Sequence, residues 1–264
     1  MKALRKALAF LRRDLATDLS YKVSFALEGV DILIGIAAFF FFSRLIGEAN
    51  PQGYDPFEFI LVGIAVNGAM STSLACFADG IQSDQSQGTL KTILVTPTSP
   101  QAVIVLSSLY PLARSSLDAF VYIIGGTLFG VSFTVANLAG AALVFLLALL
   151  AFASLGVASA AVTLILKRGD PVLWLSGGLS WLLGGVFFPI DMLPDALRQV
   201  SLLLPITHAL EALRATLLAG AGLSDVAPHV LVLAGFALVG LPLTMTLFGA
   251  AVRGAKRSGT LGHY

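Results

Sequence analysis

The sequence predicts an all-α membrane protein with six transmembrane helices, an N-terminal amphipathic interfacial helix, a short cytoplasmic helix and outer re-entrant helices between the fifth and sixth spans. Of its 264 residues, 57% are hydrophobic and only 12% are charged, which leaves too few polar residues to coat a water-soluble globule. The chain also contains six apolar runs of about the length that crosses a hydrocarbon layer as a helix. A water-soluble single domain is therefore excluded.

The first 22 residues are basic and amphipathic. Leucines recur at helical spacing on one face, at Leu4, Leu8, Leu11, Leu15 and Leu19. Arg12, Arg13 and Asp14 interrupt any apolar core of the kind that a secretory signal needs. We expect residues 1–22 to stay in the mature protein and to lie in the cytoplasmic headgroup layer. The alternative is a solvated helix without a membrane role.

The six predicted spans form one domain, residues 23–264. They cover residues 25–46, 57–78, 112–133, 138–166, 172–188 and 230–252. The last three runs contain no charged side chain, as expected where a helix must satisfy its own backbone in lipid. In the first run, Phe39–Phe42 is interpreted as lipid-facing or packing bulk rather than as a substrate site.

The distribution of Lys and Arg predicts the orientation. With the N-terminus placed in the cytoplasm, twelve of these residues fall on the inner side, against Arg44, Arg198 and Arg214 on the outer side. This excess places both termini in the cytoplasm. The formal net charge of +1 gives no reason to expect an acidic partner, and we expect no binding of nucleic acid.

A few acidic and basic residues lie at or inside predicted spans. Arg114 and Asp118 are four positions apart in the third run, so both project from one helical face. They form either a structural ion pair or part of a translocation path. Glu28 and Asp31 lie near the inner end of the first run, at the inner interface.

The cytoplasmic connection from Asp79 to Pro100 is longer than a simple linker. It contains a short predicted helix over residues 86–97, with Ser86 or Thr89 as its cap and Pro97 at its end. The segment around it is too short to form a hydrophobic core that could bury the apolar side chains of this helix. This helix either docks onto a partner protein or rests on the membrane surface.

The outer segment, residues 189–220, predicts two short amphipathic helices. Only ten residues separate Pro194 from Pro205, too few to cross a membrane. After Pro205, the side chains of Glu211 and Arg214 are expected on a more polar side, and His208 is expected at the surface or the interface. The segment is interpreted as a re-entrant cap over the pathway or, alternatively, as an ordinary outer loop. Its candidate gate residues are Pro189, Leu193, Pro194, Pro205, Thr207, Glu211 and Arg214.

The sequence contains none of the common motifs for nucleotide binding, metal-dependent hydrolysis or nucleophilic catalysis. There is no phosphate-binding P-loop, no zinc-protease motif and no nucleophile elbow. Cys76 is the only cysteine, and His208, His229 and His263 are far apart in sequence, which argues against a metal site. No catalytic residue and no metal ligand are therefore expected.

Two segments resemble the ABC-2 family of ATP-binding-cassette transporter permeases. GTLKTILVTP, residues 88–97, is similar to the family's coupling segment, and the run from Gly184 to Arg214 is similar to its pattern between the last two spans. Lys91 departs from the glutamate that the family commonly has, and residues 79–87 lack its usual Glu-Arg. The resemblance implies that the ATPase docks on Gly88, Thr89, Leu90, Ile93, Leu94, Thr96 and Pro97.

The resemblance also implies partners and a role. Two copies of the permease, a homodimer, would pair in a bacterial inner membrane with two separate ATPase subunits, which bind the ATP and Mg²⁺; this chain needs no cofactor. The family's exporters suggest outward movement of a hydrophobic or amphipathic drug, lipid or glycolipid. The alternatives are a non-transporting membrane scaffold and an ion-coupled secondary transporter, although few intramembrane acids are present to couple an ion.

Overall fold

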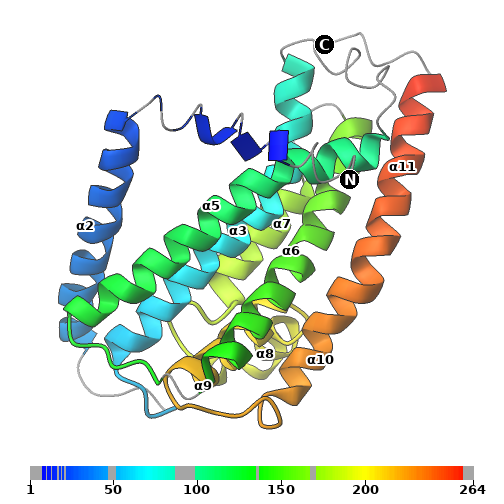
Figure 1. Ribbon diagram of the computed structural model, residues 1–264. Coiled ribbons are helices and arrows are strands. Elements are labelled where there is room, and N and C mark those ends of the chain that lie inside the picture. The colour runs from blue at the N-terminus through cyan, green and yellow to red at the C-terminus, as the bar shows by residue number, and fades with distance from the viewer. Residues whose placement is uncertain are drawn as a thin grey trace.

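The computed structural model describes residues 22–46, 52–86, 99–134, 137–166 and 171–257, with a few positions between residues 8 and 20. Within these residues the chain is helical and contains no β-strand. Figure 1 shows the helices α2 (Lys22–Ile46), α3 (Pro56–Ser86), α5 (Pro100–Leu128), α6 (Leu138–Leu166), α7 (Pro171–Leu183), η2 (Ile190–Met192), α8 (Asp195–Ser201), α9 (Pro205–Leu217), α10 (Ala227–Gly235), the π-helical η3 (Phe236–Gly240) and α11 (Leu241–Arg257).

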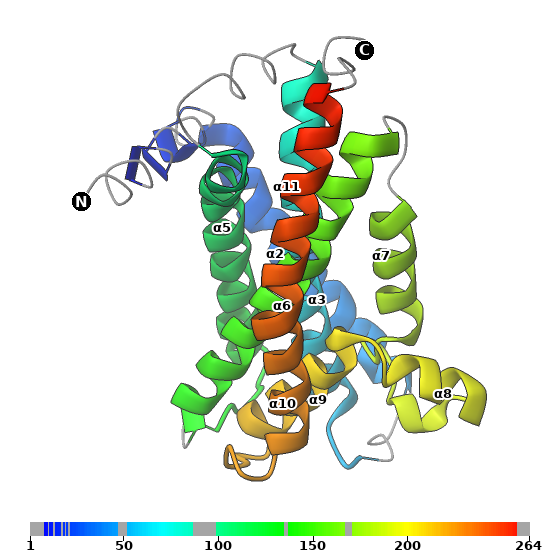
Figure 2. The same cartoon turned by 90° about the vertical axis from the view of Figure 1, so that its right-hand side faces the viewer.

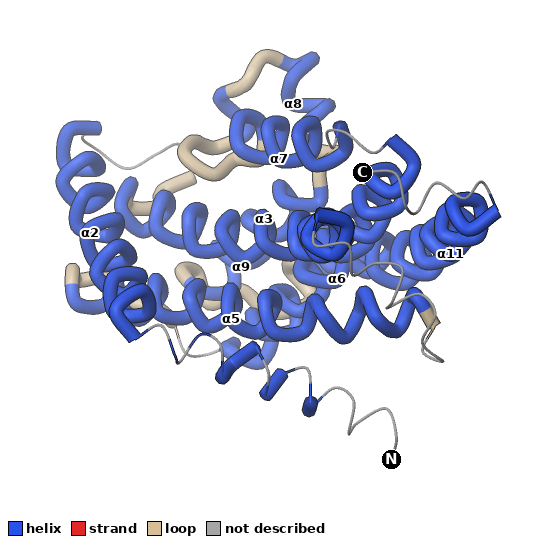
Figure 3. The backbone as a smooth tube through the Cα atoms, turned by 90° about the horizontal axis from the view of Figure 1, so that it is seen from above, coloured by secondary structure: helices blue, strands red, loops and turns tan. Residues whose placement is uncertain are grey.

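The long helices form a bundle around α3 and α6. α3 packs lengthwise against both α5 and α6, and α6 also packs against α11. α8 and α9 lie at the end of the bundle opposite to the C-terminal end of α11 (Figure 2). Viewed along the bundle, α2 and α7 lie at its edges, with α3 between them (Figure 3). The short helices therefore cover one end of the bundle.

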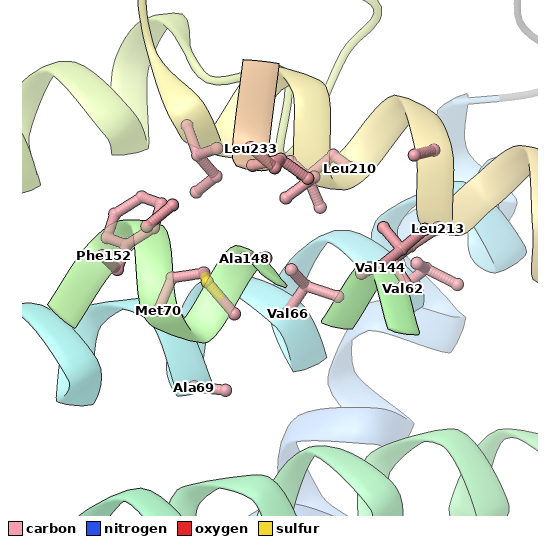
Figure 4. Close-up of a cluster of buried hydrophobic side chains, with 14 of the residues drawn as sticks. Val62, Val66, Ala69, Met70, Val144, Ala148, Phe152, Leu210, Leu213 and Leu233 are labelled. Carbon is pink, nitrogen blue, oxygen red and sulfur yellow. The ribbon is translucent and has the colours of Figure 1, made fainter. Parts of the chain in front are cut away.

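Buried apolar side chains pack α3 against α6. Figure 4 shows Val62, Val66 and Met70 of α3 facing Val144, Ala148 and Phe152 of α6, below Leu210 of α9. Close packing of this kind stabilises helices in lipid through van der Waals contact, since lipid tails are as apolar as the side chains. The hydroxyl of Ser73 also donates a hydrogen bond to the carbonyl oxygen of Leu149, at 2.9 Å.

In the part of the chain that the structure describes, three helices are long and apolar enough to cross a membrane. They are Pro56–Ser83, Leu138–Leu166 and Ala227–Arg257, which correspond to the second, fourth and sixth predicted spans. α8 and α9 together would make a fourth candidate, but they are bent by 85°. The predicted count of six spans thus stays a prediction for the regions of α2, α5 and α7.

Several helix ends differ from those predicted. α3 continues to Ser86, and α5 already begins at Pro100, because the hydroxyl of Ser99 caps it by accepting a hydrogen bond from the amide of Ala102. At the other end α5 stops at Leu128 rather than at residue 133, and Gly130 then takes a left-handed backbone with φ +93°. α7 ends at Leu183, five residues before the predicted end of the fifth span.

Two of the predicted amphipathic helices, residues 1–22 and 86–97, lie partly outside the described residues. Most of the predicted cytoplasmic helix, from residue 87 to Pro97, is among these positions. Those positions of the predicted N-terminal helix that the structure describes are helical, and Asp18 accepts a hydrogen bond from the hydroxyl of Tyr110 on α5. The interfacial location of residues 1–22 stays a prediction.

Candidate functional site

Arg214 joins three segments at the end of the bundle that α8 and α9 cover. Its side chain is only 1% exposed. Nη1 donates to the carbonyl oxygen of Gly185 at 2.8 Å, and Nη2 donates to those of Phe59 and Val186, both at 3.0 Å. Arg214 therefore fixes α9 both to the first turns of α3 and to the residues that follow α7.

Glycine at position 63 makes this approach possible. A Cβ atom there would lie 2.2 Å from the carbonyl oxygen of Val186 and 2.8 Å from Nη2 of Arg214, so any larger residue would push the segments apart. Gly185 contributes in another way, because its φ of +80° is a left-handed conformation that side chains disfavour. The two glycines thus set the path of the backbone around the guanidinium group.

The burial of Arg214 corrects the expectation that it lies on a polar side of its helix. α9 packs against α6, α10 and α3 and is buried around most of its circumference. The guanidinium group is therefore satisfied by backbone carbonyls instead of water, as a buried charge requires. The periodicity of the helix could not show this, because the acceptors come from distant parts of the chain.

Glu211, one turn before Arg214, belongs to a polar group at the end of the bundle that carries α8 and α9. The amide nitrogen of Gln52 lies 3.3 Å from a Glu211 carboxylate oxygen and 3.4 Å from Asp191. Burial and the negative charge of Glu211 raise the pKa of the Tyr54 hydroxyl above its usual value, whereas Arg214 lowers it. The loop before α3 therefore packs against the segment predicted to cap the pathway.

The other predicted gate residues mark the boundaries of the short helices. Pro189 precedes η2, Leu193 follows it, and Pro194 precedes α8. Pro205 is the first residue of α9, where its missing amide hydrogen costs nothing. Thr207 is 1% exposed, and its hydroxyl has no hydrogen-bond partner among the described residues. The two amphipathic helices thus occur where the prolines predicted them; their re-entrant role stays a prediction.

The structure brings together two histidines that the sequence keeps apart. Nδ1 of His208 on α9 lies 3.0 Å from Nδ1 of His229 on α10. His208 is 8% exposed, so the expectation of a surface histidine was wrong. No signal in the sequence indicates this pair, because it depends on how α10 folds back along α9. Among the described residues no group of three or more histidine, cysteine or acidic side chains could hold a metal ion.

Near the middle of α5, Arg114 connects this helix to α2. Its Nη2 donates to the carboxylate of Glu28 and lies 3.6 Å from Asp118 on its own helix. Glu28, which sequence reasoning placed only at the interface, is therefore a partner of the predicted intramembrane pair. A cavity of about 260 Å³ beside this group is lined by Glu28, Asp31, Thr72, Ser115, Asp118 and Tyr122, among others.

A second cavity continues along α3 toward its C-terminal end. It has a volume of about 620 Å³ between α3 and α5 and is lined by hydroxyl and small side chains and one acid, including Ser71, Thr72, Asp79, Ser83 and Ser107. The predicted docking residues, from Gly88 to Pro97, would follow directly along the chain, but they lie outside the described residues.

Comparison with known families gives one match that covers most of the chain. A family model described as ABC-2 type transporter matches residues 9–218, which include every helix from α2 to α9. A search of curated proteins found no match.

Proposed function

The chain belongs to the ABC-2 type transporter family, and from this premise we propose that it is the permease subunit of an exporter for hydrophobic or amphipathic molecules. Permeases of this family work with ABC ATPase subunits. In this proposal ATP and Mg²⁺ bind to the ATPase, whereas the present chain supplies the pathway and the helices that move.

The contact between Arg214 and α3 is the observation that best supports this role. α3 runs from the loop before Pro56 to Ser86, directly before the segment proposed to dock onto the ATPase. Arg214 fastens the outer helix α9 and the residues after α7 to the other end of α3. Because a continuous helix moves nearly as one body, displacement of its inner end by the ATPase would be transmitted to the outer helices.

The exposed face of α3 supports the proposal of a transport pathway along this helix. Gly68, Ser71 and Asp79 are exposed along one side of this helix, and the two cavities lie beside them. Polar side chains on a span are costly against lipid, so they usually face a partner or an aqueous path. We propose that this face of α3, which borders the cavities beside α2 and α5, lines the path and is completed by a second copy of the chain in a homodimer.

The surface of the bundle is consistent with a multi-pass membrane location. Large apolar side chains are exposed on the helices at its edges, such as Phe41 and Leu45 of α2 and Trp174 and Leu182 of α7. We place the chain in a bacterial inner membrane with both termini in the cytoplasm, because Lys and Arg are concentrated on that side. The end that carries α8 and α9 is then the outer end.

A single substitution in the proposed coupling segment tests the function. The change Leu90→Glu would place a charge on the apolar face of the docking helix. Burying that carboxylate against the ATPase is unfavourable, so we expect the amount of copurified ATPase and the rate of ATP-driven export each to fall about tenfold. Gln87→Glu adds the same charge just before the segment and serves as the control.

The outcomes separate the candidate functions. Loss of assembly in Leu90→Glu but not in Gln87→Glu would support the permease. Unchanged assembly and export in both variants would contradict the docking role. A chain that never copurifies with a P-loop ATPase would instead favour the scaffold or the ion-coupled transporter.

A further inference from the structure

His208 and His229 link two helices at the end of the bundle that carries α8 and α9. The rings are tilted by 49°, and their Nδ1 atoms lie 3.0 Å apart, within hydrogen-bond distance. The other nitrogen of His208, Nε2, lies 2.8 Å from the carbonyl oxygen of Leu202. The pair therefore connects α10 to α9 and, through Leu202, to the turn between α8 and α9.

These distances fix the neutral forms of both rings. A carbonyl oxygen can only accept, so Nε2 of His208 carries the hydrogen and its Nδ1 has the lone pair. His229 must then donate from its own Nδ1. A neutral histidine has one N–H group, which leaves Nε2 of His229 as the nitrogen that can take up a proton.

The two possible protonation steps have different effects on the contact. A first proton on Nε2 of His229 leaves the Nδ1–H donor in place, so the hydrogen bond is kept and becomes charge-assisted. A second proton has to bind to Nδ1 of His208, the acceptor itself. Two N–H groups and two positive charges would then face one another, and the contact must break.

Two charges act on His229, namely those of His208 and Glu211. The helices α6, α7 and η3 contain no ionisable side chain over their length. α9 also carries Arg214, which is bound to backbone carbonyls. The other ionisable groups that the structure describes at this end include Glu58 on α3, Asp195 and Arg198 on α8, Asp225 before α10, and Tyr54, Asp55 and Asp191 in the adjoining segments. The protonation of the pair is thus governed mainly by the two rings and Glu211.

We propose that His208 and His229 form a proton-sensitive contact, which holds α9 against α10 at neutral pH and releases it when the outer side becomes acidic. This inference rests on the proposed function in one respect, namely that the end carrying α8 and α9 faces outward. Release requires the second proton, which has to add to a pair that already carries one positive charge, so it needs a more acidic exterior than the pH near 6.5 at which an ordinary imidazole takes up its proton. Its release would loosen the helices that cap the pathway.

The histidine contact itself can be tested without transport. The chain has three histidines, so ring-¹⁵N-histidine labelling gives the Nδ1 and Nε2 signals of three imidazole rings in detergent micelles or nanodiscs, assigned with His208→Gln, His229→Gln and His263→Gln. At pH 7.5 we expect His208 as the Nε2–H form and His229 as the Nδ1–H form, with coupled titration of the two rings. Independent titration of the rings, or an Nε2–H form of His229 at pH 7.5, would overturn the proposal.

The regulatory role is tested with the complete transporter in proteoliposomes whose ATPase side faces outward, so that the lumen corresponds to the outer side. In His229→Gln the amide can donate to His208 or accept from it, so the contact survives protonation. Between lumen pH 7.5 and 4.5, a range that includes the second protonation of the pair, we expect the rate of ATP hydrolysis to change about five-fold in the native protein, the factor for losing one hydrogen bond, and less than two-fold in His229→Gln. His263→Gln is the matched control and should behave as the native protein does.

The imidazole spectra and the ATP hydrolysis assay distinguish failure of the regulatory proposal from failure of the proposed transport function. Equal pH profiles for the native protein and His229→Gln would overturn the regulatory role. Absence of ATP hydrolysis at every lumen pH would be a failure of the proposed function, whereas the imidazole spectra would still decide whether the contact exists.

Discussion

The guanidinium group of Arg214 lies on the ring of Phe59, with Cζ 3.3 Å from the ring centroid, and also donates a hydrogen bond to the carbonyl oxygen of the same residue. One residue of α3 thus receives two contacts from α9. A buried arginine is favourable only if its donors are satisfied, and here three carbonyl oxygens satisfy them. The contact therefore makes α9 and the N-terminal end of α3 one structural unit.

Replacing Arg214 should strongly destabilise the protein. In Arg214→Met the carbonyl oxygens of Phe59, Gly185 and Val186 lose a charged donor, and we expect a loss of at least about 3 kcal/mol. Arg214→Lys keeps the charge but cannot reach all three acceptors, so its effect should be smaller. The midpoint of thermal unfolding in detergent micelles measures both.

Arg198 provides the control for this change. It lies on α8, is about half exposed and pairs with Asp191 at 2.8 Å. An exposed ion pair contributes little, so Arg198→Met should cost less than about 1 kcal/mol. If the two Arg→Met variants unfolded at the same temperature, the structural role assigned to Arg214 would be wrong.

Gly63 should not tolerate even one additional methyl group. In Gly63→Ala the new Cβ would meet the carbonyl oxygen of Val186 at 2.2 Å, and the backbone of that segment would have to move. We expect a destabilisation of about 1–3 kcal/mol, together with less ATP-driven export for each ATP hydrolysed, since α9 would no longer follow α3.

Gly68→Ala is the matched control on the same helix. A Cβ at this position has nothing within 4 Å, and alanine favours a helix over glycine by up to about 1 kcal/mol. The variant should therefore be as stable as the native protein or slightly more stable. A loss of stability equal to that of Gly63→Ala would show that the effect is not due to the contact with Val186.

Much of the helical architecture was predictable from the sequence because it depends on local signals. Pro194 and Pro205 predict the starts of the two short helices, since proline is tolerated only at or before the first turn. The start of α5 was missed, although Ser99 and Pro100 form a recognisable cap. The prediction had followed the apolar run, which begins later than the helix.

The candidate site was less predictable because its contacts join distant parts of the chain. Arg214 binds the carbonyl of a residue 155 positions away, and backbone carbonyls have no sequence signature. On a helical wheel Arg214 and Glu211 share a side, which suggested water as their environment. Likewise, His208 and His229 are 21 positions apart, and the residues between them show no periodicity that would bring the two rings together.

Gly156 should be required for the central contact between α3 and α6. A Cβ there would lie 2.7 Å from the carbonyl oxygen of Leu74 and 2.8 Å from that of Ser73. Backbone atoms cannot move aside cheaply, so Gly156→Ala should destabilise the bundle by about 1–3 kcal/mol. Gly177→Ala on α7, where a Cβ meets nothing within 4 Å, should have little effect in the same unfolding experiment.

The group of Glu28, Arg114 and Asp118 should act mainly as a link between α2 and α5. The side chain of Arg114 is 18% exposed and that of Glu28 is 59% exposed, so their interaction is partly screened by solvent. A double-mutant cycle with Glu28→Gln and Arg114→Gln should give a coupling energy of about 1 kcal/mol. The cycle with Asp118→Asn should give less, because that pair is 3.6 Å apart and lies within one helix.

Export measured on the same variants separates the two interpretations of the charged group. A structural link predicts that Glu28→Gln lowers the unfolding temperature while the export rate for each folded transporter stays within about two-fold, since the pair then acts through stability alone. If these acids bind a cationic part of the cargo instead, Glu28→Gln and Asp118→Asn would both raise the cargo concentration needed for half-maximal export, because either change removes a negative charge from the cavity. Their unfolding temperatures would then not account for the loss.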